Sequence, residues 1–177
     1  MKNRAVFLDR DGVLIRDAEY LASVDGLRVL KGVPEALKLL KKAGFKLVVV
    51  TNQSGVARGY FTMGAVRKVN AELKRRLAAK SAKWDAVFVS PHGPESKSPM
   101  RKPGIGMLLA AKRRFNLDLS ASYLVGDKTS DIECARRAGC AGVLVKTGKG
   151  GRDRAFKAKP AAVKKDLLAA AHWIAEI

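Results

Sequence analysis

The sequence predicts an α/β fold, a three-layer sandwich in which helices cover both faces of a mainly parallel sheet of five strands or slightly more. Two features of the chain lead to this prediction. Short apolar runs rich in β-branched residues alternate with amphipathic segments along the whole length, as in a sheet whose strands are joined by helices. The apolar runs lack polar alternation, which is typical of strands covered on both faces. The crossovers between such strands are expected to be right-handed.

Each element follows from a local pattern. The run AVFL (Ala5–Leu8) predicts the first strand. In VPEALKLLKKAG, Pro34 stands near the first turn and Gly44 supplies a stop, so a helix is expected there. The alternation of elements is that of a Rossmann-like domain. The other expected strands cover residues 45–51, 85–90, 122–126 and 142–146, and the other expected helices cover about 62–80, 106–115, 130–138 and 160–175.

The composition fits one soluble domain spanning residues 1–177. The chain is long enough for a sizeable core, and 47% of it is apolar, unlike a disordered chain. Its apolar runs are far shorter than the roughly 20 residues needed to cross a bilayer, and its start is too short in apolar residues for a secretory signal. We therefore expect a cytoplasmic protein with no membrane partner. Cys134 and Cys140 fit neither a metal pair nor a disulfide framework, so free, partly buried thiols are expected.

The formal charge of +19 would draw the chain toward polyanions, including nucleic acid and phosphorylated small molecules. The basic residues, however, are spread over most of the length. In VRKVNAELKRRLAAK the apolar residues lie at helical spacing and leave the cations mostly on other faces. A solvated helix surface is favoured over a nucleic-acid stripe, because no RNP motif, zinc finger or helix-turn-helix signature is found. We expect no specific nucleic-acid partner.

Unusual polar residues follow the expected strands, at the edge where parallel sheets bind ligands. Asp9 and Asp11 come directly after the first strand, and Asp127 follows the strand at residues 122–126. Two adjacent carboxylates repel each other unless a cation lies between them, and Mg²⁺ prefers carboxylate and carbonyl oxygens. Three such groups would hold one Mg²⁺ and leave room for a phosphate oxygen. Taken alone, Asp9 and Asp11 could equally be turn or N-cap residues.

Two other strands lead to groups suited to anions. In TNQSG, residues 51–55, a hydroxyl, amides and backbone N–H groups form a cradle for anionic oxygens, with a simple turn as the alternative. In MRKPG, Lys102 could place a charge on a phosphoryl group and Arg101 could clamp it in bidentate fashion. Adjacent basic residues in so basic a chain are usually surface residues, and only their place after the third strand favours function.

The strings FLDRDGVL, TNQSG, RKP and GDKTSD, in this order, resemble the four motifs of haloacid dehalogenase-like (HAD) phosphatases. The longer strings VVVTNQSGVARG, RKPGIGML, SYLVGDK and VKTGK are similar to the branch of heptose bisphosphate phosphatases and histidinol-phosphatases, and more closely to the former. The resemblance covers nearly the whole chain. It implies a Mg²⁺-dependent phosphomonoesterase that removes the 7-phosphate of D-glycero-D-manno-heptose 1,7-bisphosphate, a step toward ADP-heptose for bacterial lipopolysaccharide.

The resemblance also implies roles for single residues. Asp9 matches the nucleophile, which forms an aspartyl-phosphate, and Asp11 matches the general acid and base. The ligands of one Mg²⁺ would be Asp9, the backbone carbonyl near Asp11, and Asp127. Thr51 and Lys102 would stabilise the transferring phosphoryl group. The residues that match substrate recognition are Asp17, Tyr20, Asn52, Ser54, Arg101 and Lys128.

One loop departs from the pattern of the branch. Its members usually carry a zinc loop, Cys-x-His and then Cys-x-Cys, just before RKP. The matching positions here are Ser90, His92, Ser98 and Met100. Two hydroxyls, one imidazole and one thioether do not make a structural Zn²⁺ site, so no structural zinc is expected. The Mg²⁺ chemistry does not depend on this zinc. The segments between the motifs leave no room for a cap domain, so an open site is expected.

Three functions remain in view. The first is a phosphatase, expected to be a monomer, that acts on a small phosphorylated sugar, with histidinol-phosphatase or another sugar phosphatase of the superfamily as the alternative. The second is a nucleic-acid 3′-phosphatase, which the charge favours and the missing kinase P-loop disfavours. The third is a catalytically dead anion-binding scaffold, which the intact Asp9, Asp11, Lys102 and Asp127 disfavour.

The basic, glycine-rich segment 147–160 is expected to be a mobile loop, and a phosphate-binding role there is left open. Asp131 is expected to orient Lys102 or the metal ligands.

Overall fold

The computed structural model describes residues 2–176 and contains a six-stranded sheet in which every neighbouring pair of strands is parallel. The strand order is β3-β2-β1-β4-β5-β6, so β1 lies near the middle of the sheet. The predicted class, with a sheet slightly larger than five strands, is confirmed. The strands are β1 (Ala5–Leu8), β2 (Lys46–Asn52), β3 (Ala86–Ser90), β4 (Tyr123–Gly126), β5 (Ala141–Val145) and β6 (Ala162–Lys164).

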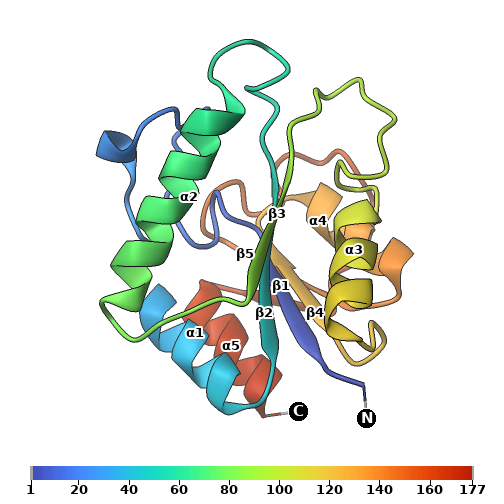
Figure 1. Cartoon of the computed structure of the whole chain (residues 1–177). Coiled ribbons are helices and arrows are strands. Elements are labelled where there is room, and N and C mark those ends of the chain that lie inside the picture. The colour runs from blue at the N-terminus through green and yellow to red at the C-terminus, as the bar shows by residue number, and fades with distance from the viewer. Residues whose placement is uncertain (1, 177) are drawn as a thin grey trace.

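Helices cover both faces of the sheet, as Figure 1 shows. Three of them, α1, α2 and α5, lie on one face, and α3 and α4 lie on the other. Cys134 and Cys140 are free, as expected, but both are buried rather than partly buried. Within residues 2–176, no helix is long and apolar enough to span a membrane. The helices are α1 (Val33–Lys42), α2 (Met63–Ala78), α3 (Gly106–Phe115), α4 (Thr129–Ala138) and α5 (Leu167–Ala175), with a 3₁₀ turn at Val24–Gly26.

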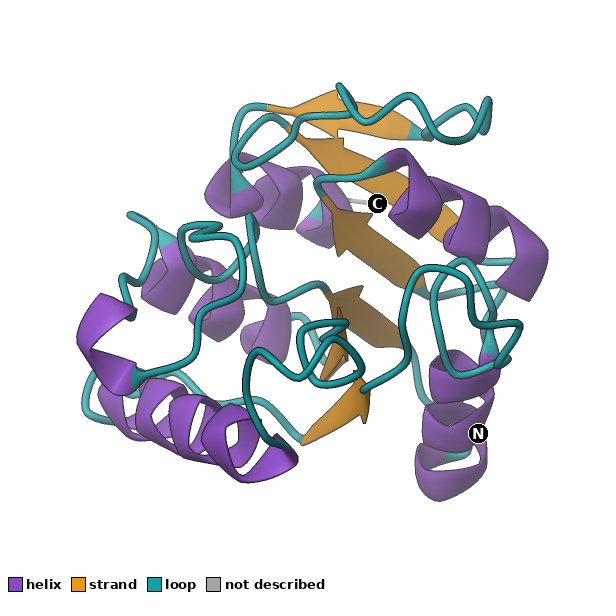
Figure 2. Cartoon of the chain, turned by 90° about the horizontal axis from the view of Figure 1, so that it is seen from above, coloured by secondary structure: helices purple, strands orange, loops and turns teal. Residues whose placement is uncertain are grey.

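The side chains of β1 feed two apolar cores, because successive residues of a strand point to opposite faces. Val6 and Leu8 enter the core beneath α1, α2 and α5, whereas Ala5 and Phe7 enter the core beneath α3 and α4. All four side chains are fully buried, and burying each of the larger ones contributes roughly 1.5–3 kcal/mol. A strand fixed on both faces therefore delivers Asp9 at its carboxyl end. Seen from above in Figure 2, the loops that follow the strands lie over this edge of the sheet.

The C-terminal region differs from the prediction. The expected helix over residues 160–175 is wrong at its start, because residues 162–164 form the edge strand β6. Helix α5 begins only at Leu167, after Asp166, whose side chain accepts a hydrogen bond from the Ala169 N–H. Strand β6 is short and only partly covered, so its sequence AVK lacks the apolar run that revealed the other strands.

Candidate active site

The side chains predicted to act together converge at the carboxyl edge of the sheet. Asp9 directly follows β1, Thr51 lies near the end of β2, and Asp127 directly follows β4. Lys102 comes from the loop between β3 and α3, and all four residues are buried. Because β2, β1 and β4 are neighbours in the sheet, the topology brings together residues that lie far apart in the sequence.

Three buried carboxylates form the centre of this site. Oxygens of Asp9, Asp127 and Asp131 lie within 4.8 Å of one another. Asp127 Oδ2 accepts a hydrogen bond of 2.6 Å from the Lys149 backbone N–H, whereas Asp127 Oδ1 is buried with no partner among the described residues. Burial, and then the charge of Asp9, raises the pKa of Asp127 to about 7. A cation would satisfy the unpaired oxygen and offset both effects, so these residues fit a bound Mg²⁺.

Lys102 is a cation that the chain itself supplies to the cluster. Its Nζ lies 3.0 Å from Asp9 Oδ1 and 2.7 Å from Asp131 Oδ1. Burial disfavours the charged ammonium, but the carboxylates of Asp131 and Asp9 outweigh it and raise the pKa of Lys102. Asp131 Oδ2 accepts a hydrogen bond of 3.1 Å from the Lys128 backbone N–H. Since both oxygens of Asp131 are engaged, Asp131 holds Lys102, and Asp9 and Asp127 are left for a metal.

Asn52 fixes the loop that carries Lys102. Asn52 Nδ2 donates to the Lys102 carbonyl at 3.0 Å, and the Lys102 N–H donates to Asn52 Oδ1 at 3.0 Å. In the same loop, Arg101 Nη1 donates to the His92 carbonyl at 2.9 Å. Asn52, predicted to bind substrate, therefore also joins the end of β2 to the loop after β3.

Asp11 lies beside the cluster and has partners of its own. Gln53 Nε2 donates to Asp11 Oδ2 at 2.8 Å and to Thr51 Oγ1 at 2.7 Å, and Arg10 Nη2 lies 3.1 Å from Asp11 Oδ2. Burial raises the pKa of Asp11, and the charge of Arg10 opposes this rise. The prediction missed Arg10 and Gln53 as site residues. An arginine between two aspartates was the signal for Arg10, and the place of Gln53 within TNQSG was the signal for Gln53.

Two hollows open beside these groups, with volumes of about 320 and 280 Å³. Every residue predicted to recognise substrate lines one or both of them. Asp11, Asn52, Ser54 and Lys128 line both, Asp17 and Tyr20 line the larger, and Asp9, Arg101 and Lys102 line the smaller.

Two glycines allow the backbone to pass close to Asp127. A Cβ on Gly12 would lie 2.5 Å from Asp127 Oδ2, and one on Gly148 would lie 2.3 Å from the same oxygen. Between these two chain segments, Thr147 Oγ1 donates to the Gly12 carbonyl at 2.6 Å. The start of the segment 147–160 therefore packs against the loop after β1 and covers one side of Asp127.

The loop at residues 91–105 takes its shape from local contacts. The Ser98 N–H donates to Ser96 Oγ, and the Met100 N–H donates to Ser98 Oγ. The Met100 side chain packs against the core beneath α3 and α4. Just before this loop, at the end of β3, the Ser90 hydroxyl oxygen is buried and has no hydrogen-bond partner among the described residues. These positions offer no thiolate that could bind zinc.

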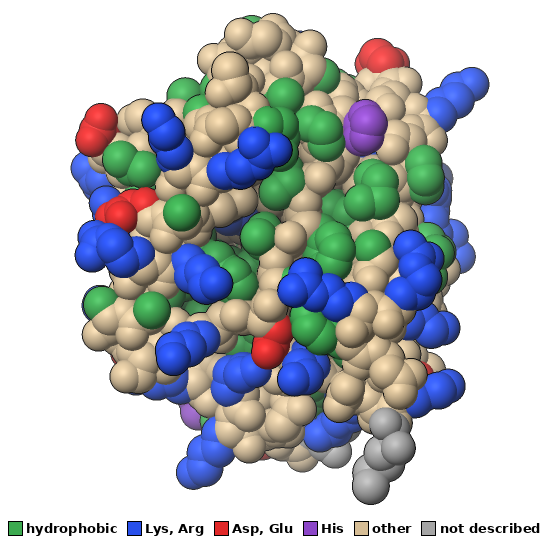
Figure 3. Space-filling view, viewed as in Figure 1, with side chains coloured by type: hydrophobic (Ala, Val, Ile, Leu, Met, Phe, Trp, Pro, Cys, Tyr) green, Lys and Arg blue, Asp and Glu red, His purple; other side chains and the backbone are tan. Residues whose placement is uncertain are grey.

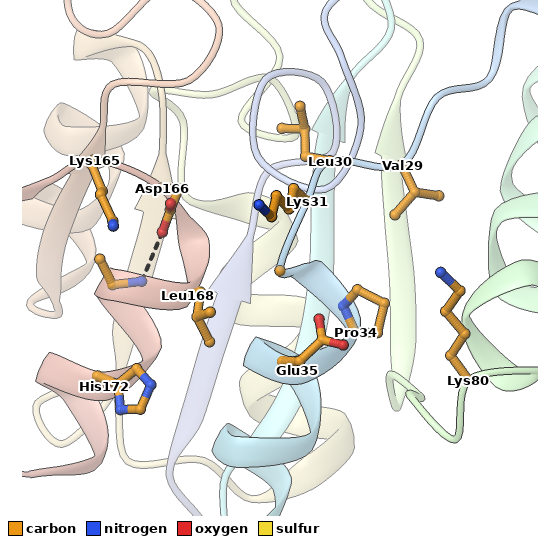
Figure 4. Close-up of a pocket in the computed structure, with 12 residues that line it drawn as sticks. Val29, Leu30, Lys31, Pro34, Glu35, Lys80, Lys165, Asp166, Leu168 and His172 are labelled. Atoms are coloured by element: carbon orange, nitrogen blue, oxygen red, sulfur yellow. Dashed lines mark hydrogen bonds between the residues drawn. The ribbon is translucent and has the colours of Figure 1, made fainter.

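A larger cavity, of about 860 Å³, lies away from the site, between α1 and α5 (Figure 4). Leu30 and Leu168 are among the residues that line it, and the lining lysines Lys31, Lys80 and Lys165 are exposed. None of the predicted site residues lines it. Because a binding site is marked by convergent polar groups rather than by volume alone, the candidate chemistry belongs to the two smaller hollows.

The basic surface is dispersed on the face shown in Figure 3. Lysine and arginine side chains are scattered there among apolar and neutral groups, and acidic side chains are few. This distribution is typical of a solvated, positively charged surface that attracts small anions from solution.

The comparisons with known proteins agree with this geometry. Residues 6–97 match the haloacid dehalogenase-like hydrolase family, and residues 99–170 match a further HAD-hydrolase-like family. The chain is 40% identical to a D-glycero-D-manno-heptose-1,7-bisphosphate 7-phosphatase of Thermosynechococcus vestitus, over 98% of this chain and 96% of that protein. It is 41% identical to the D-glycero-beta-D-manno-heptose-1,7-bisphosphate 7-phosphatase of Escherichia coli K12, over 82% of this chain and 80% of that one.

Solved structures give the same relationship. A D,D-heptose 1,7-bisphosphate phosphatase from B. bronchiseptica, complexed with magnesium and phosphate, is 35% identical, with a TM-score of 0.90 and 98% of each chain covered. A HAD-like phosphatase from Mesorhizobium loti is 34% identical, with a TM-score of 0.82 over 98% of this chain and 88% of that one. The chain therefore belongs to the haloacid dehalogenase-like hydrolases, in the branch of the heptose bisphosphate phosphatases.

Proposed function

We propose that this chain is a Mg²⁺-dependent phosphatase that removes the 7-phosphate of D-glycero-D-manno-heptose 1,7-bisphosphate. The observation that carries the proposal is the placement of Asp9, a buried carboxylate at the end of β1, 3.0 Å from the Lys102 ammonium and beside a hollow of about 280 Å³. The named activities of relatives at 40–41% identity support the choice of substrate. The whole chain would form one catalytic domain with an open site and no cap domain.

Asp9 would act as the nucleophile. One of its oxygens attacks phosphorus in line, the bond from phosphorus to the sugar oxygen breaks, and an aspartyl-phosphate forms. Asp11 gives its proton to the departing sugar oxygen. It then takes a proton from the water that hydrolyses the aspartyl-phosphate, which restores Asp9 and releases phosphate.

The surrounding groups would stabilise the charge on the transferring phosphoryl group. Lys102 is held at the nucleophile by Asp131 and contributes a fixed positive charge. Thr51 Oγ1 accepts a hydrogen bond from Gln53, so its proton is free to point at a phosphoryl oxygen. Asp9, Asp127 and the backbone carbonyl of Asp11 would hold one Mg²⁺, which when bound neutralises charge on the phosphoryl oxygens.

The two hollows would hold the rest of the substrate. Arg101 and Lys128 supply positive charge for anionic groups, and Asn52 and Ser54 supply hydrogen-bonding groups on the shared wall. Asp17 and Tyr20 would contact sugar hydroxyls in the larger hollow. Related enzymes are named for the beta anomer in Escherichia coli and for the alpha anomer in Burkholderia mallei. Both anomers therefore belong in the assay.

We expect the loop at residues 91–105 to function without structural zinc. Serine hydroxyls, one imidazole and one thioether stand where a zinc site would need thiolates. Metal analysis of the purified protein should find less than a stoichiometric amount of zinc. One tightly held zinc ion per chain would contradict this part of the proposal.

Phosphate release in the presence of Mg²⁺ tests the substrate. The panel should hold both anomers of heptose 1,7-bisphosphate, histidinol phosphate, fructose 1,6-bisphosphate and a 3′-phosphorylated oligonucleotide. We expect kcat/KM for the preferred heptose anomer to exceed kcat/KM for each compound that is not a heptose by about 100-fold. This ratio corresponds to roughly 2.7 kcal/mol of transition-state discrimination. Equal, low activity on every compound would reject the heptose as substrate, and a preference for the oligonucleotide would favour a nucleic-acid 3′-phosphatase.

A further inference from the structure

The arginine between the two site aspartates has no part in the chemistry described above. Arg10 is 1% exposed, although it carries a guanidinium. Its backbone N–H donates to Asp9 Oδ1 at 2.8 Å, while its side chain lies against Asp11. The nucleophile and the general acid therefore both contact this one residue, through different groups.

The guanidinium of Arg10 spans both oxygens of the Asp11 carboxylate. Arg10 Nη2 lies 3.2 Å from Asp11 Oδ1 and 3.1 Å from Oδ2, and Arg10 Nε lies 3.3 Å from Oδ2. Gln53 adds a hydrogen bond of 2.8 Å to Oδ2. The Asp11 side chain is 17% exposed, and it lines both hollows of the site. The carboxylate is thus fixed from the protein side and open on the substrate side.

Helix α2 fixes the other end of the guanidinium. Arg10 Nη1 donates to Asn70 Oδ1 at 2.9 Å, and Asn70 is itself buried. Burying a guanidinium is costly, and replacing a buried ion pair with apolar residues is often neutral or stabilising. Stability alone therefore does not account for a charged side chain at this position. A requirement for fixed geometry does, because the planar fork of arginine sets the direction of each hydrogen bond.

We infer that Arg10 is a positioning residue which, braced by Asn70, holds the Asp11 carboxylate where it can protonate the leaving oxygen. The inference rests on the proposed function. A sugar alkoxide is a strongly basic leaving group and needs that proton, and general acid catalysis is worth roughly 10²–10⁴-fold when the acid is well placed. A p-nitrophenolate is weakly basic and departs without a proton. Loss of Arg10 therefore affects the two kinds of phosphate ester unequally.

The test compares kcat/KM for heptose 1,7-bisphosphate and for p-nitrophenyl phosphate, since kcat/KM covers the steps up to release of the leaving group and excludes hydrolysis of the aspartyl-phosphate. In Arg10→Lys, which keeps the charge but loses the fork, we expect a fall of about 30–100-fold with the sugar phosphate and less than about 3-fold with the aryl phosphate. Arg76→Lys is the matched control, because within residues 2–176 Arg76 bonds only to Glu72 and the Leu27 carbonyl. It should leave both values unchanged.

A second pair of variants keeps the test decisive if Arg10→Lys does not fold. Asn70→Leu removes the brace, and we expect a fall of about 3–10-fold for the sugar phosphate alone. Asn70→Asp keeps an acceptor for Arg10 and should restore the ratio of the two substrates to within about 2-fold of the unchanged protein.

The outcomes separate this inference from the proposed function. If the unchanged protein releases phosphate but the variants lose activity equally on both esters, Arg10 has a structural role only and the inference is overturned. Unchanged activity in Arg10→Lys, or an unchanged ratio in Asn70→Leu, would overturn it as well. If the unchanged protein hydrolyses neither ester, the proposed function itself is wrong, and the inference is rejected with it.

Discussion

The loop after β1 and the loop after β3 both reach the active site, but they are held in place differently. In the first, the Arg10 carbonyl accepts hydrogen bonds from the N–H groups of Leu14 and Ile15 at 2.9 and 3.1 Å, and residues 12–15 are buried. In the second, serine hydroxyls and Met100 hold residues that are mostly half-buried or exposed. The reacting carboxylates thus lie in a largely buried turn. The more exposed loop supplies Lys102, which Asn52 and Asp131 hold, and part of the substrate wall.

Asp9→Asn should have the largest effect, because the amide cannot attack phosphorus. We expect kcat to fall at least about 10³-fold while the unfolding midpoint stays close to that of the unchanged protein. Phosphate release and a thermal melt on the same sample measure both. Asp25→Asn, at an exposed position, is the control. Phosphatase activity that survived in Asp9→Asn would remove Asp9 as the nucleophile.

Gly148→Ala tests how closely the backbone must approach Asp127. Its new Cβ would fall 2.3 Å from Asp127 Oδ2, whereas Gly139, which also has positive φ, has nothing within 4 Å. Gly139→Ala should therefore cost only the strain of the backbone, about 1 kcal/mol. Gly148→Ala should also raise the Mg²⁺ concentration for half-maximal activity by about tenfold, because the carboxylate must move.

A Mg²⁺ titration of activity measures the difference between the two glycine variants. If both variants gave the same titration curve, the segment 147–160 would have no part in shaping the metal site.

Arg101→Ala should alter substrate binding more than chemistry, because Arg101 lines the smaller hollow and lies in the more exposed of the two loops. We expect KM to rise about tenfold or more, from the loss of a charge-assisted contact worth roughly 1.5–3 kcal/mol, with kcat changed less than about 3-fold. Steady-state kinetics with heptose 1,7-bisphosphate gives both values, and Arg113→Ala on the exposed side of α3 is the control. A larger loss in kcat than in KM would instead place Arg101 with the reacting groups.

Met100→Ala should show how firmly the loop after β3 is anchored. Met100 is only partly buried, whereas Met107 lies fully buried in the same core. We expect the free energy of unfolding to fall by about 1–2 kcal/mol for Met100→Ala and by about 2–5 kcal/mol for Met107→Ala. Urea denaturation measures both, and kcat should be unaffected by Met100→Ala. An equal loss in the two variants would mean that this loop is as well packed as the core.

The sequence predicted the carboxylates of the site better than it predicted their partners. Asp9, Asp11 and Asp127 stand directly after apolar runs, and parallel strands bring such positions to one edge. The partners of Asp11 were harder to predict, because the contact between Arg10 and Asn70 joins residues 60 apart and depends on how α2 packs. Strand β6 was missed because half-covered edge strands carry little apolar signal.

Glu133→Gln should have the smallest effect and should leave both loops unchanged. Arg136 and Arg137 lower the pKa of Glu133 from its ordinary value of 4.5 to about 2. A carboxylate whose pKa is lower in the folded state adds stability above pH 4.5, and this contribution is lost as the pH falls through about 2.

The unchanged protein should therefore be slightly more stable than Glu133→Gln at pH 7, and the difference should vanish near pH 2. Urea midpoints across this range measure the difference, and groups common to both proteins, such as Glu72, cancel. The kcat/KM at pH 7 should be the same in both, because Glu133, Arg136 and Arg137 line neither hollow of the site, and the two arginine side chains are exposed. A stability difference that grew toward low pH would show that Glu133 is destabilised, not stabilised, by its surroundings.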